Sequence, residues 1–303
     1  MSGGGPRLAG VELGGTKCVC IVGTGPGDIA TQISVATGDD AEVTLGQIEA
    51  ILRDLDRAMG PIAALGVASF GPVDLDPRSP TWGFITSTPK PGWSQVDVGR
   101  RLARALGRPT GFDTDVNGAA LAEGRWGAAQ ELSDFAYVTV GTGVGVGLIA
   151  GGRPIGGFSH PEIGHMRVPR LEGDDWPGSC PFHGDCVEGL ASGSAIRARL
   201  GGGSSAMLTA DDPIWAPVAH ALGAMAHNLV VTAAPRRILM GGGVMNAQPH
   251  LFGRIRRELE RSLAGYLMLP ELESFIRPPA LGDLAGPLGA LALADNALTA
   301  ERL

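Results

Sequence analysis

Two apolar stretches of the chain are interrupted by glycine in the same way. The apolar run Leu8–Leu13 stops at Gly14–Lys17 and then resumes, and the run Tyr137–Val140 stops at Gly141–Gly143 and resumes over Val144–Ile149. Short apolar runs on both sides of a glycine turn are typical of a β-hairpin. The pattern therefore predicts two hairpins, each with a glycine loop at its tip.

Helical and strand-like patterns alternate after each hairpin. In Val43–Met59 the apolar residues recur with the spacing of one helix face, and Gly71–Trp93 is rich in proline and glycine and is expected to be mostly loop. Further helices are expected over Val96–Leu106, Leu190–Leu200, Ile214–Val231, Leu251–Leu263 and Leu284–Ala294, and further strands within Ile29–Val35, at Ala63–Ala68, before Asp113 and at Arg237–Met240. These alternating elements predict a duplicated α/β architecture with a nucleotide between the halves.

We place the domain boundary after residue 114, which gives an N-terminal α/β domain over 1–114 and a C-terminal one over 115–303. A C-terminal helix over about 283–303 can pack back on the first domain. A chain of 303 residues exceeds what one small core needs, so two domains fit its length.

Composition and charge exclude several classes of function. Apolar residues make up 44% and charged residues 18%, as in a globular protein, and the net charge of −7 argues against a nucleic-acid or polybasic membrane surface. The segment 1–6 lacks the features of a signal peptide, and no apolar stretch is long enough to span a bilayer. We therefore expect a cytoplasmic protein that binds neither nucleic acid nor membrane.

Three glycine clusters are candidate nucleotide-binding loops. Backbone N–H groups in a tight glycine turn can approach a phosphate closely, and each hairpin loop adds a hydroxyl group. The candidate residues are Gly14, Gly15, Thr16 and Lys17 in the first loop, Gly141, Thr142 and Gly143 in the second, and Gly241, Gly242 and Gly243, which could admit an adenine ring. Ordinary turns remain the alternative for each cluster taken alone.

Two familiar nucleotide-binding motifs are excluded by context. A P-loop requires Gly-Lys followed by Ser or Thr, and the chain contains no Gly-Lys pair. The dinucleotide fingerprint requires a helix after its glycines, whereas Gly141–Gly147 continues into a strand-like segment, and Val146 occupies the position of the last glycine.

A carboxylate lies where a predicted strand ends and a helix begins. Asp115 follows Asp113-Thr114 and precedes Val116-Asn117. Phosphoryl transfer to a hydroxyl needs a carboxylate that accepts the hydroxyl proton, and the carboxyl ends of strands are where α/β folds bind ligands. Asp115 could act as this base, and helix capping is the alternative.

The stretch from Cys180 to Cys186 has the spacing of a metal site. Cys180, His183 and Cys186 occur at every third position, and His165 lies fifteen residues upstream of the first of them. Tetrahedral Zn²⁺ takes four nitrogen or sulfur ligands, so these residues predict a structural zinc ion in a loop over 160–189. A reactive cysteine pair or a chance mixture is the alternative.

The ordered series of motifs resembles the ROK group of sugar kinases, and within it the bacterial fructokinases. The resemblance extends from Gly10 to about Ala294. The stretches that carry it are Gly10–Lys17, Ser69–Pro77, Thr88–Trp93, Thr114–Ala119, His160–His165 and Cys180–Gly189. The resemblance implies an actin-like, ribonuclease H-like ATPase fold with two duplicated α/β domains around a central cleft.

The resemblance also implies a role for individual residues. Asp115 matches the catalytic base, and the sugar contacts match Glu162, His165, Glu188, Asn117 and Gly71. His165 would bind both sugar and zinc, and Glu12 would lie near the water shell of magnesium. Relatives often have a cysteine where this chain has His183, Asn-Asp where it has Thr114-Asp115, and Asp at the place of Glu12.

The expected activity is transfer of phosphate from MgATP to the primary hydroxyl of a hexose, O6 of D-fructose, by a homodimer. A kinase for glucose, mannose or an N-acetylated amino sugar is the nearest alternative. Sugar-responsive repressors of the group carry a helix-turn-helix ahead of the kinase-like part, and only a short stretch precedes Gly10 here. A sugar-binding protein without catalysis is disfavoured by Asp115 and the two glycine loops.

Overall fold

The computed structural model describes residues 5–203, 205 and 208–301, and its contacts divide the chain into two units. The first unit comprises 1–131, 153–161 and 280–303, and the second comprises 132–152 and 162–279. The ends of the predicted domain ranges, residues 1–4 and 302–303, lie outside the described residues.

The first unit is built on a five-stranded sheet with the order β3-β2-β1-β4-β7. β1 and β2 form the first predicted hairpin, and β4 and β7 then add in parallel with β1. The strands are β1 (Leu8–Leu13), β2 (Lys17–Gly25), β3 (Asp28–Ala36), β4 (Ala64–Ser69) and β7 (Thr110–Thr114). Two short strands, β5 (Phe84–Ile85) and β6 (Val96–Asp97), pair with each other, and β10 is Arg153–Pro154.

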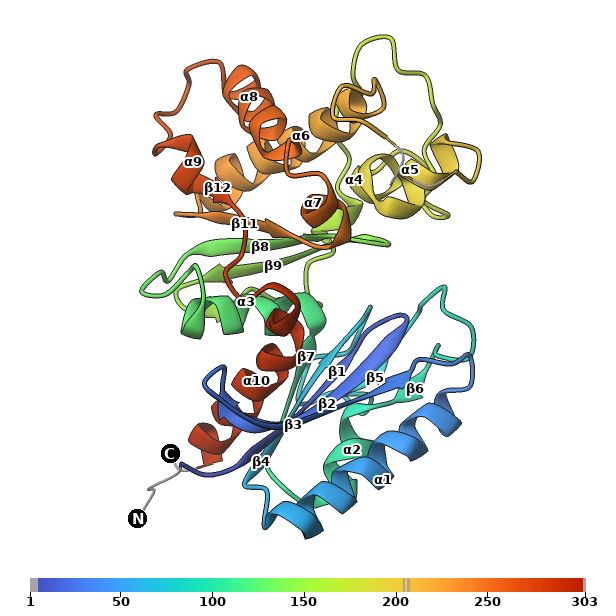
Figure 1. The fold of residues 1–303 in the computed structure, drawn as a ribbon, viewed down its shortest axis with the longest axis vertical. Coiled ribbons are helices and arrows are strands. Elements are labelled where there is room, and N and C mark those ends of the chain that lie inside the picture. The colour runs from blue at the N-terminus through green and yellow to red at the C-terminus, as the bar shows by residue number, and fades with distance from the viewer. Residues whose placement is uncertain (1–4, 204, 206–207, 302–303) are drawn as a thin grey trace. The chain divides into compact units, whose positions relative to one another are not determined.

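Helices cover both faces of this sheet (Figure 1). α1 (Ala41–Met59) and α2 (Gly99–Leu106) pack on one face, and the buried residues Leu45, Ile48 and Leu52 of α1 lie there with Trp93. α3 (Asp115–Trp126), the short turn η3 (Gly282–Leu284) and α10 (Ala285–Glu301) lie on the other face. A side chain at Gly66 in β4 would place its Cβ 1.8 Å from the carbonyl oxygen of Ala290, so glycine is required where α10 crosses the sheet.

The second unit repeats the strand order of the first. The sheet has the order β10-β9-β8-β11-β12, and its last four strands match β2-β1-β4-β7, again with an antiparallel hairpin followed by parallel strands. The strands are β8 (Phe135–Val140), β9 (Val144–Ala150), β11 (Ile238–Gly241) and β12 (Ile276–Arg277). The repeated order confirms the predicted duplication, with the two glycine loops at equivalent turns.

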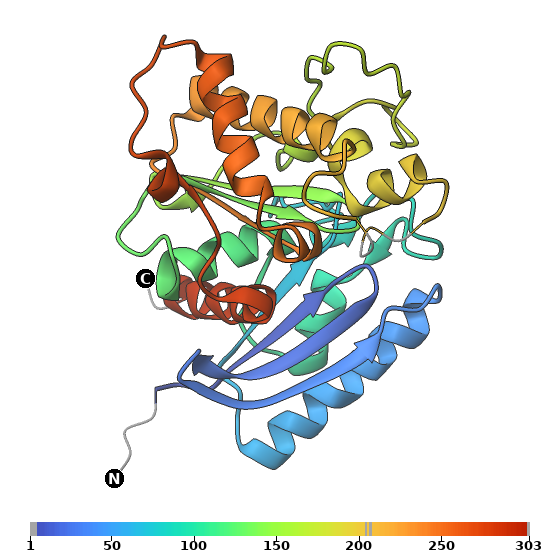
Figure 2. The ribbon, with the colours of Figure 1, turned by 45° about the horizontal axis from the view of Figure 1, so that its top comes forward.

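Helices of the second unit gather beside its sheet, with α8 packed on α6 (Figures 1 and 2). They are η1 (Ile163–His165), α4 (Val187–Ala191), α5 (Gly193–Arg199), α6 (Trp215–Ala233), α7 (Gly243–Ala247), α8 (Leu251–Leu263) and α9 (Leu272–Phe275). Within the described residues, no helix has the length and apolarity to cross a membrane.

Three details differ from the expected elements. The helix expected over Leu190–Leu200 is two helices, because Ser192 is extended (φ −69°, ψ 162°) and caps α5 by accepting a hydrogen bond from Ala195 N. The helix expected from Val96 begins at Gly99, since Val96 and Asp97 form β6. The contacts group α3 and residues 153–161 with the first unit, whereas the sequence placed the boundary after residue 114.

Candidate active site and metal centre

The first glycine loop, Gly14–Thr16, joins β1 to β2 and is held by the end of β3. Gly14 N donates to Lys17 O at 3.0 Å, and Thr37 binds the loop twice, through its N–H to Thr16 O and its hydroxyl to Gly14 O. Gly15, Thr16 and Lys17 are exposed. The loop is therefore fixed from behind while its outer surface stays open to a ligand.

The loop after β4 is anchored next to the first glycine loop. Lys90 Nζ donates to Thr37 O at 3.2 Å, and Trp93 Nε1 donates to Gly38 O at 2.8 Å. Trp93 is fully buried in the core of the first unit. These contacts fix one end of the long segment that begins at Gly71, a predicted sugar contact.

The second glycine loop, Gly141–Gly143, joins β8 to β9 and is tied to α4 and α5. Glu188 Oε2 accepts a hydrogen bond from Val144 N at 3.1 Å and lies so close to Gly143 that an added Cβ would be 2.5 Å away. Gly193 N donates to Gly141 O at 2.7 Å. Thr142 is exposed at the tip of the loop. A predicted sugar contact, Glu188, thus directly supports a predicted phosphate loop.

The third glycine cluster forms the turn between β11 and α7. Gly242 has φ of 90°, and a Cβ there would lie 2.6 Å from Val140 O, so only glycine fits against the end of β8. Gly241 is buried and Gly243 is exposed. The turn therefore lies beside the strand that leads into the second glycine loop.

Asp115 is the first residue of α3 and follows β7 directly. Thr114 caps this helix by accepting a hydrogen bond from Asn117 N at 3.1 Å, so the capping role proposed as the alternative for Asp115 belongs to Thr114. Asp115 is half-buried, and its Oδ1 accepts from Val116 N at 2.9 Å. Its carboxylate stands at the carboxyl end of a parallel strand, where α/β folds place reactive groups.

Asp113 and Asn117 lock the turn that carries Asp115. Asp113 Oδ1 accepts hydrogen bonds from Thr114 N and from Asn117 Nδ2, both at 2.7 Å. Burial raises the pKa of the Asp113 carboxyl, while the bonds from Asn117 and Thr114 oppose that rise. Asn117 is 3% exposed. The buried Asn117 side chain therefore acts here as a brace for the turn.

Glu162, His165 and Glu188 form one electrostatic group. His165 Nε2 lies 3.9 Å from Glu188 Oε1, and Glu162 interacts with both of them. Although Glu162 is exposed as a residue, burial of its carboxyl group raises its pKa, and His165 counteracts that effect. The structure thus brings together the three sugar contacts predicted in this half of the chain.

Glu12 on β1 is a carboxyl group in a poorly solvated position. Burial raises its pKa to about 7, and nearby Lys17 reduces that shift. A Cβ added to Gly286, near the start of α10, would lie only 2.0 Å from the Oε1 atom of Glu12. Burial of an unpaired carboxylate is costly, so the position suits a group that meets a cation.

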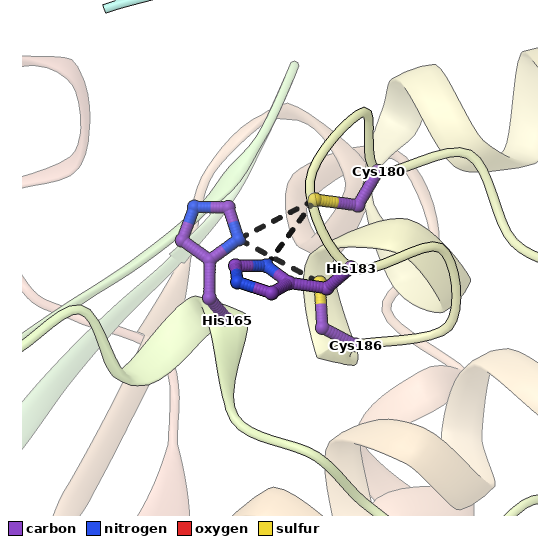
Figure 3. Close-up of side chains that lie close together, drawn as sticks. All are labelled: His165, Cys180, His183 and Cys186. Carbon is purple, nitrogen blue, oxygen red and sulfur yellow. Dashed lines mark hydrogen bonds between the residues drawn. The ribbon is translucent and has the colours of Figure 1, made fainter. Parts of the chain in front are cut away.

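His165, Cys180, His183 and Cys186 converge on one point (Figure 3). Their ligand atoms lie within 4.8 Å of one another, and the three N–S distances that join His165 or His183 Nδ1 to a sulfur are each 3.6 Å. Tetrahedral zinc with ordinary bond lengths separates nitrogen from sulfur by about 3.5 Å. The four residues therefore fit a tetrahedral zinc ion in donor type and in spacing.

The ring of His165 connects the metal centre to the carboxylates. Its Nδ1 faces Cys180 and Cys186, and its Nε2 faces Glu188. An ion on Nδ1 would fix the orientation of the ring and hence the direction of Nε2. This arrangement fits the predicted double role of His165.

Two buried polar residues, His160 and Glu123, are not among the predicted site residues. His160, 7% exposed, accepts a hydrogen bond from Val73 N through Nε2 at 3.0 Å. Glu123, fully buried in α3, accepts from Ala128 N at 2.6 Å, Ala280 N at 3.0 Å and Leu281 N at 2.8 Å. His160 is the first residue of the stretch His160–His165, and Glu123 is a single acid in an alanine-rich helix. Neither sequence pattern indicates the distant backbone groups that these side chains bind.

A model of the ROK family matches residues 8–297 of the chain. A fructokinase of Pediococcus pentosaceus is 39% identical over 96% of this chain and 98% of its own length. A fructokinase of Zymomonas mobilis subsp. mobilis is 40% identical over 94% of this chain and 95% of its own length.

Solved structures with the same fold include two sugar kinases. A ROK hexokinase from Thermus thermophilus superposes with a TM-score of 0.79 at 28% identity, over 97% of this chain and 99% of its own. A ROK family glucokinase from Streptomyces griseus in complex with glucose and AMPPNP superposes with a TM-score of 0.75 at 26% identity, over 96% of this chain and 99% of its own.

Proposed function

The chain belongs to the ROK family, and on that premise we propose that it is an ATP-dependent hexose kinase that converts D-fructose to fructose 6-phosphate. The observation that carries the proposal is the near-complete alignment with fructokinases at about two identical residues in five. The actin-like fold, which is similar to that of the ROK hexokinase from Thermus thermophilus, and the two glycine loops support the proposal.

Asp115 is the proposed general base. It would accept the proton of the fructose O6 hydroxyl as that oxygen attacks the γ-phosphoryl group of ATP. Its place at the end of β7, with Thr114 as the helix cap and Asp113 and Asn117 as braces, supports this role. A carboxylate on a fixed turn can hold the hydroxyl in line for transfer, and positioning supplies much of the catalysis.

Glu162, His165 and Glu188 are the proposed sugar ligands of the second unit, with Gly71 and Asn117 as those of the first. The first three form one electrostatic group, which supports their joint role. Carboxylates accept hydrogen bonds from sugar hydroxyls, and the imidazole can donate or accept one. The hydrogen bond from Val144 N to Glu188 would couple the sugar site to the second glycine loop.

The nucleotide is proposed to bind through the three glycine clusters. The exposed backbone of Gly14–Lys17 and Gly141–Gly143 would contact the phosphates, and Gly241–Gly243 would lie against the adenine. Magnesium bound with ATP neutralises charge on the phosphates, and Glu12 would meet its water shell. A nearby cation would favour the ionised form of Glu12 and so lower its elevated pKa.

Zinc is the proposed metal of the His165, Cys180, His183 and Cys186 site, with a structural role. The ion would hold the loop over 160–189 and orient His165 toward the sugar. The four protein ligands would fill the coordination of a tetrahedral zinc ion, so no position would remain for a reacting group.

A homodimer in the cytoplasm is the assembly that we propose. Light scattering after size exclusion tests the dimer directly.

An ADP-release assay over a panel of sugars tests the proposed function. Fructose should give the highest kcat/KM, ahead of glucose, mannose and N-acetylated amino sugars. A higher kcat/KM for another hexose would identify that hexose as the preferred substrate in place of fructose. Absence of ADP release with every sugar would reject the kinase assignment.

A further inference from the structure

His160 lies where three segments of the first unit meet, and none of the roles above uses it. Val73 N donates a hydrogen bond to His160 Nε2 at 3.0 Å, and both residues are buried, with exposed fractions of 3% and 7%. A buried backbone N–H without an acceptor costs free energy, so the His160 ring stabilises the fold by accepting this hydrogen bond.

The hydrogen bond from Val73 determines which ring nitrogen carries the proton. Because Nε2 accepts a bond, the neutral ring of His160 must hold its proton on Nδ1. Nδ1 faces the carbonyl oxygen of Pro161 at 3.4 Å, and burial, the main influence, lowers the pKa of the ring. The ring therefore joins Val73 to Pro161, whose carbonyl forms the peptide bond with Glu162.

The third segment is the turn that carries Asp115. Asp113 lies close enough to His160 that each influences the pKa of the other, and Asp113 in turn accepts hydrogen bonds from Thr114 N and Asn117 Nδ2. His160 is thus bonded to the segment that contains Gly71, contacts the residue before Glu162, and lies beside the turn that carries Asp115. Gly71 and Glu162 are assigned above to the sugar, and Asp115 is assigned as the base.

We infer that His160 is a positioning residue for the fructose site, which holds these three segments in register without touching the sugar. This inference rests on the proposed function. A kinase loses rate when the hydroxyl or the base moves by a fraction of a bond length, so a rigid joint between sugar-binding segments affects catalysis. The alternative is that His160 only fills space in the core.

Two substitutions at His160 separate these roles. Glutamine can place an acceptor oxygen where Nε2 lies, whereas asparagine is too short to reach Val73 N. Both side chains are polar and neutral, so both disturb the core to a similar degree. The matched control is His227→Asn, because His227 is a partly exposed histidine whose Nδ1 pairs with Ser262 Oγ at 2.9 Å.

The kinetic test measures kcat and KM for fructose and for ATP in each variant. His160→Asn should lower kcat/KM for fructose by at least about tenfold, with KM for ATP changed less than about twofold, because the sugar and the base lose their alignment. His160→Gln should stay within about threefold of the wild type, and His227→Asn should match it.

Hydrogen exchange supplies a readout that does not depend on activity. Peptides that contain the Val73 amide should exchange faster in His160→Asn and at the wild-type rate in His160→Gln. The inference is overturned if the two His160 variants have equal fructose kinetics, or if His160→Asn loses protection at Val73 yet keeps its fructose efficiency. An inactive wild-type protein would instead reject the proposed function itself, so the two failures are distinct.

Discussion

Replacing Glu12 with glutamine should stabilise the nucleotide-free protein, and the gain should grow as the pH rises. The folded state raises the pKa of Glu12 from 4.5 to about 7 through burial. A folded-state pKa above the unfolded value means that the folded protein holds its proton longer, so stability falls as pH rises from about 4.5 to about 7. Below that window the carboxyl is neutral in both states and carries no penalty.

The size of the effect follows from the two pKa values. Proton linkage gives a penalty of about 1 kcal/mol at pH 5 and about 3 kcal/mol at pH 8, which the neutral glutamine does not incur. For a chain of this size, about 2 kcal/mol corresponds to a Tm change of about 4 °C. The difference in Tm between Glu12→Gln and the wild type should therefore be about 4 °C larger at pH 8 than at pH 5, in favour of the variant.

Differential scanning fluorimetry in buffer without metal or nucleotide measures this difference. Glu260→Gln on α8 is the matched control, because Glu260 is exposed and should show a Tm difference that does not vary with pH. A Tm difference between Glu12→Gln and the wild type that stays constant from pH 5 to pH 8 would refute the reasoning. The same variant should have a lower kcat, since the proposed contact with the water shell of magnesium requires the ionised carboxylate.

Two further predictions concern buried groups outside the sugar site. Cys186→Ser should lose the zinc that the wild type holds at about one ion per chain, as measured by elemental analysis, whereas Cys18→Ser, which replaces a buried thiol that is not a member of the cluster, should retain it. Zinc-free wild-type protein with an unchanged Tm would contradict the structural role of the metal. Glu123→Ala should reduce the free energy of unfolding by about 3–5 kcal/mol, because three backbone amides lose their acceptor and the fully buried side chain leaves a cavity, whereas Glu260→Ala should change it by less than about 0.5 kcal/mol. Equal Tm values for these two variants would show that the Glu123 carboxylate does not hold the chain near Ala280.

The hairpins and the repeat were predictable because their signals are local. A glycine-rich turn between two apolar runs determines a hairpin by itself, and both loops, Gly14–Thr16 and Gly141–Gly143, occur as expected. The helix α8 begins and ends at the predicted residues, since its apolar positions repeat regularly. The metal cluster was equally predictable from the sequence, because three of its four ligands lie within one short loop.

The features that sequence reasoning missed depend on partners far away in the chain. His160 acquires its role from Val73, 87 residues earlier, and Glu123 acquires two of its three donors from Ala280 and Leu281, more than 150 residues later. No periodicity marks such pairs. The break at Ser192 was missed because an apolar helical pattern continues through it, while the serine caps a new helix.

The most direct test of the central claim measures fructose phosphorylation by Asp115→Asn against Asp54→Asn, a control at an exposed position of α1. If Asp115 removes the proton from the fructose hydroxyl, its replacement should lower kcat by about 10²- to 10⁴-fold with ATP affinity little changed. Asp54→Asn should keep the wild-type kcat, with fructose 6-phosphate identified as the product by NMR. An Asp115→Asn variant that turns over fructose at nearly the wild-type rate would contradict the account.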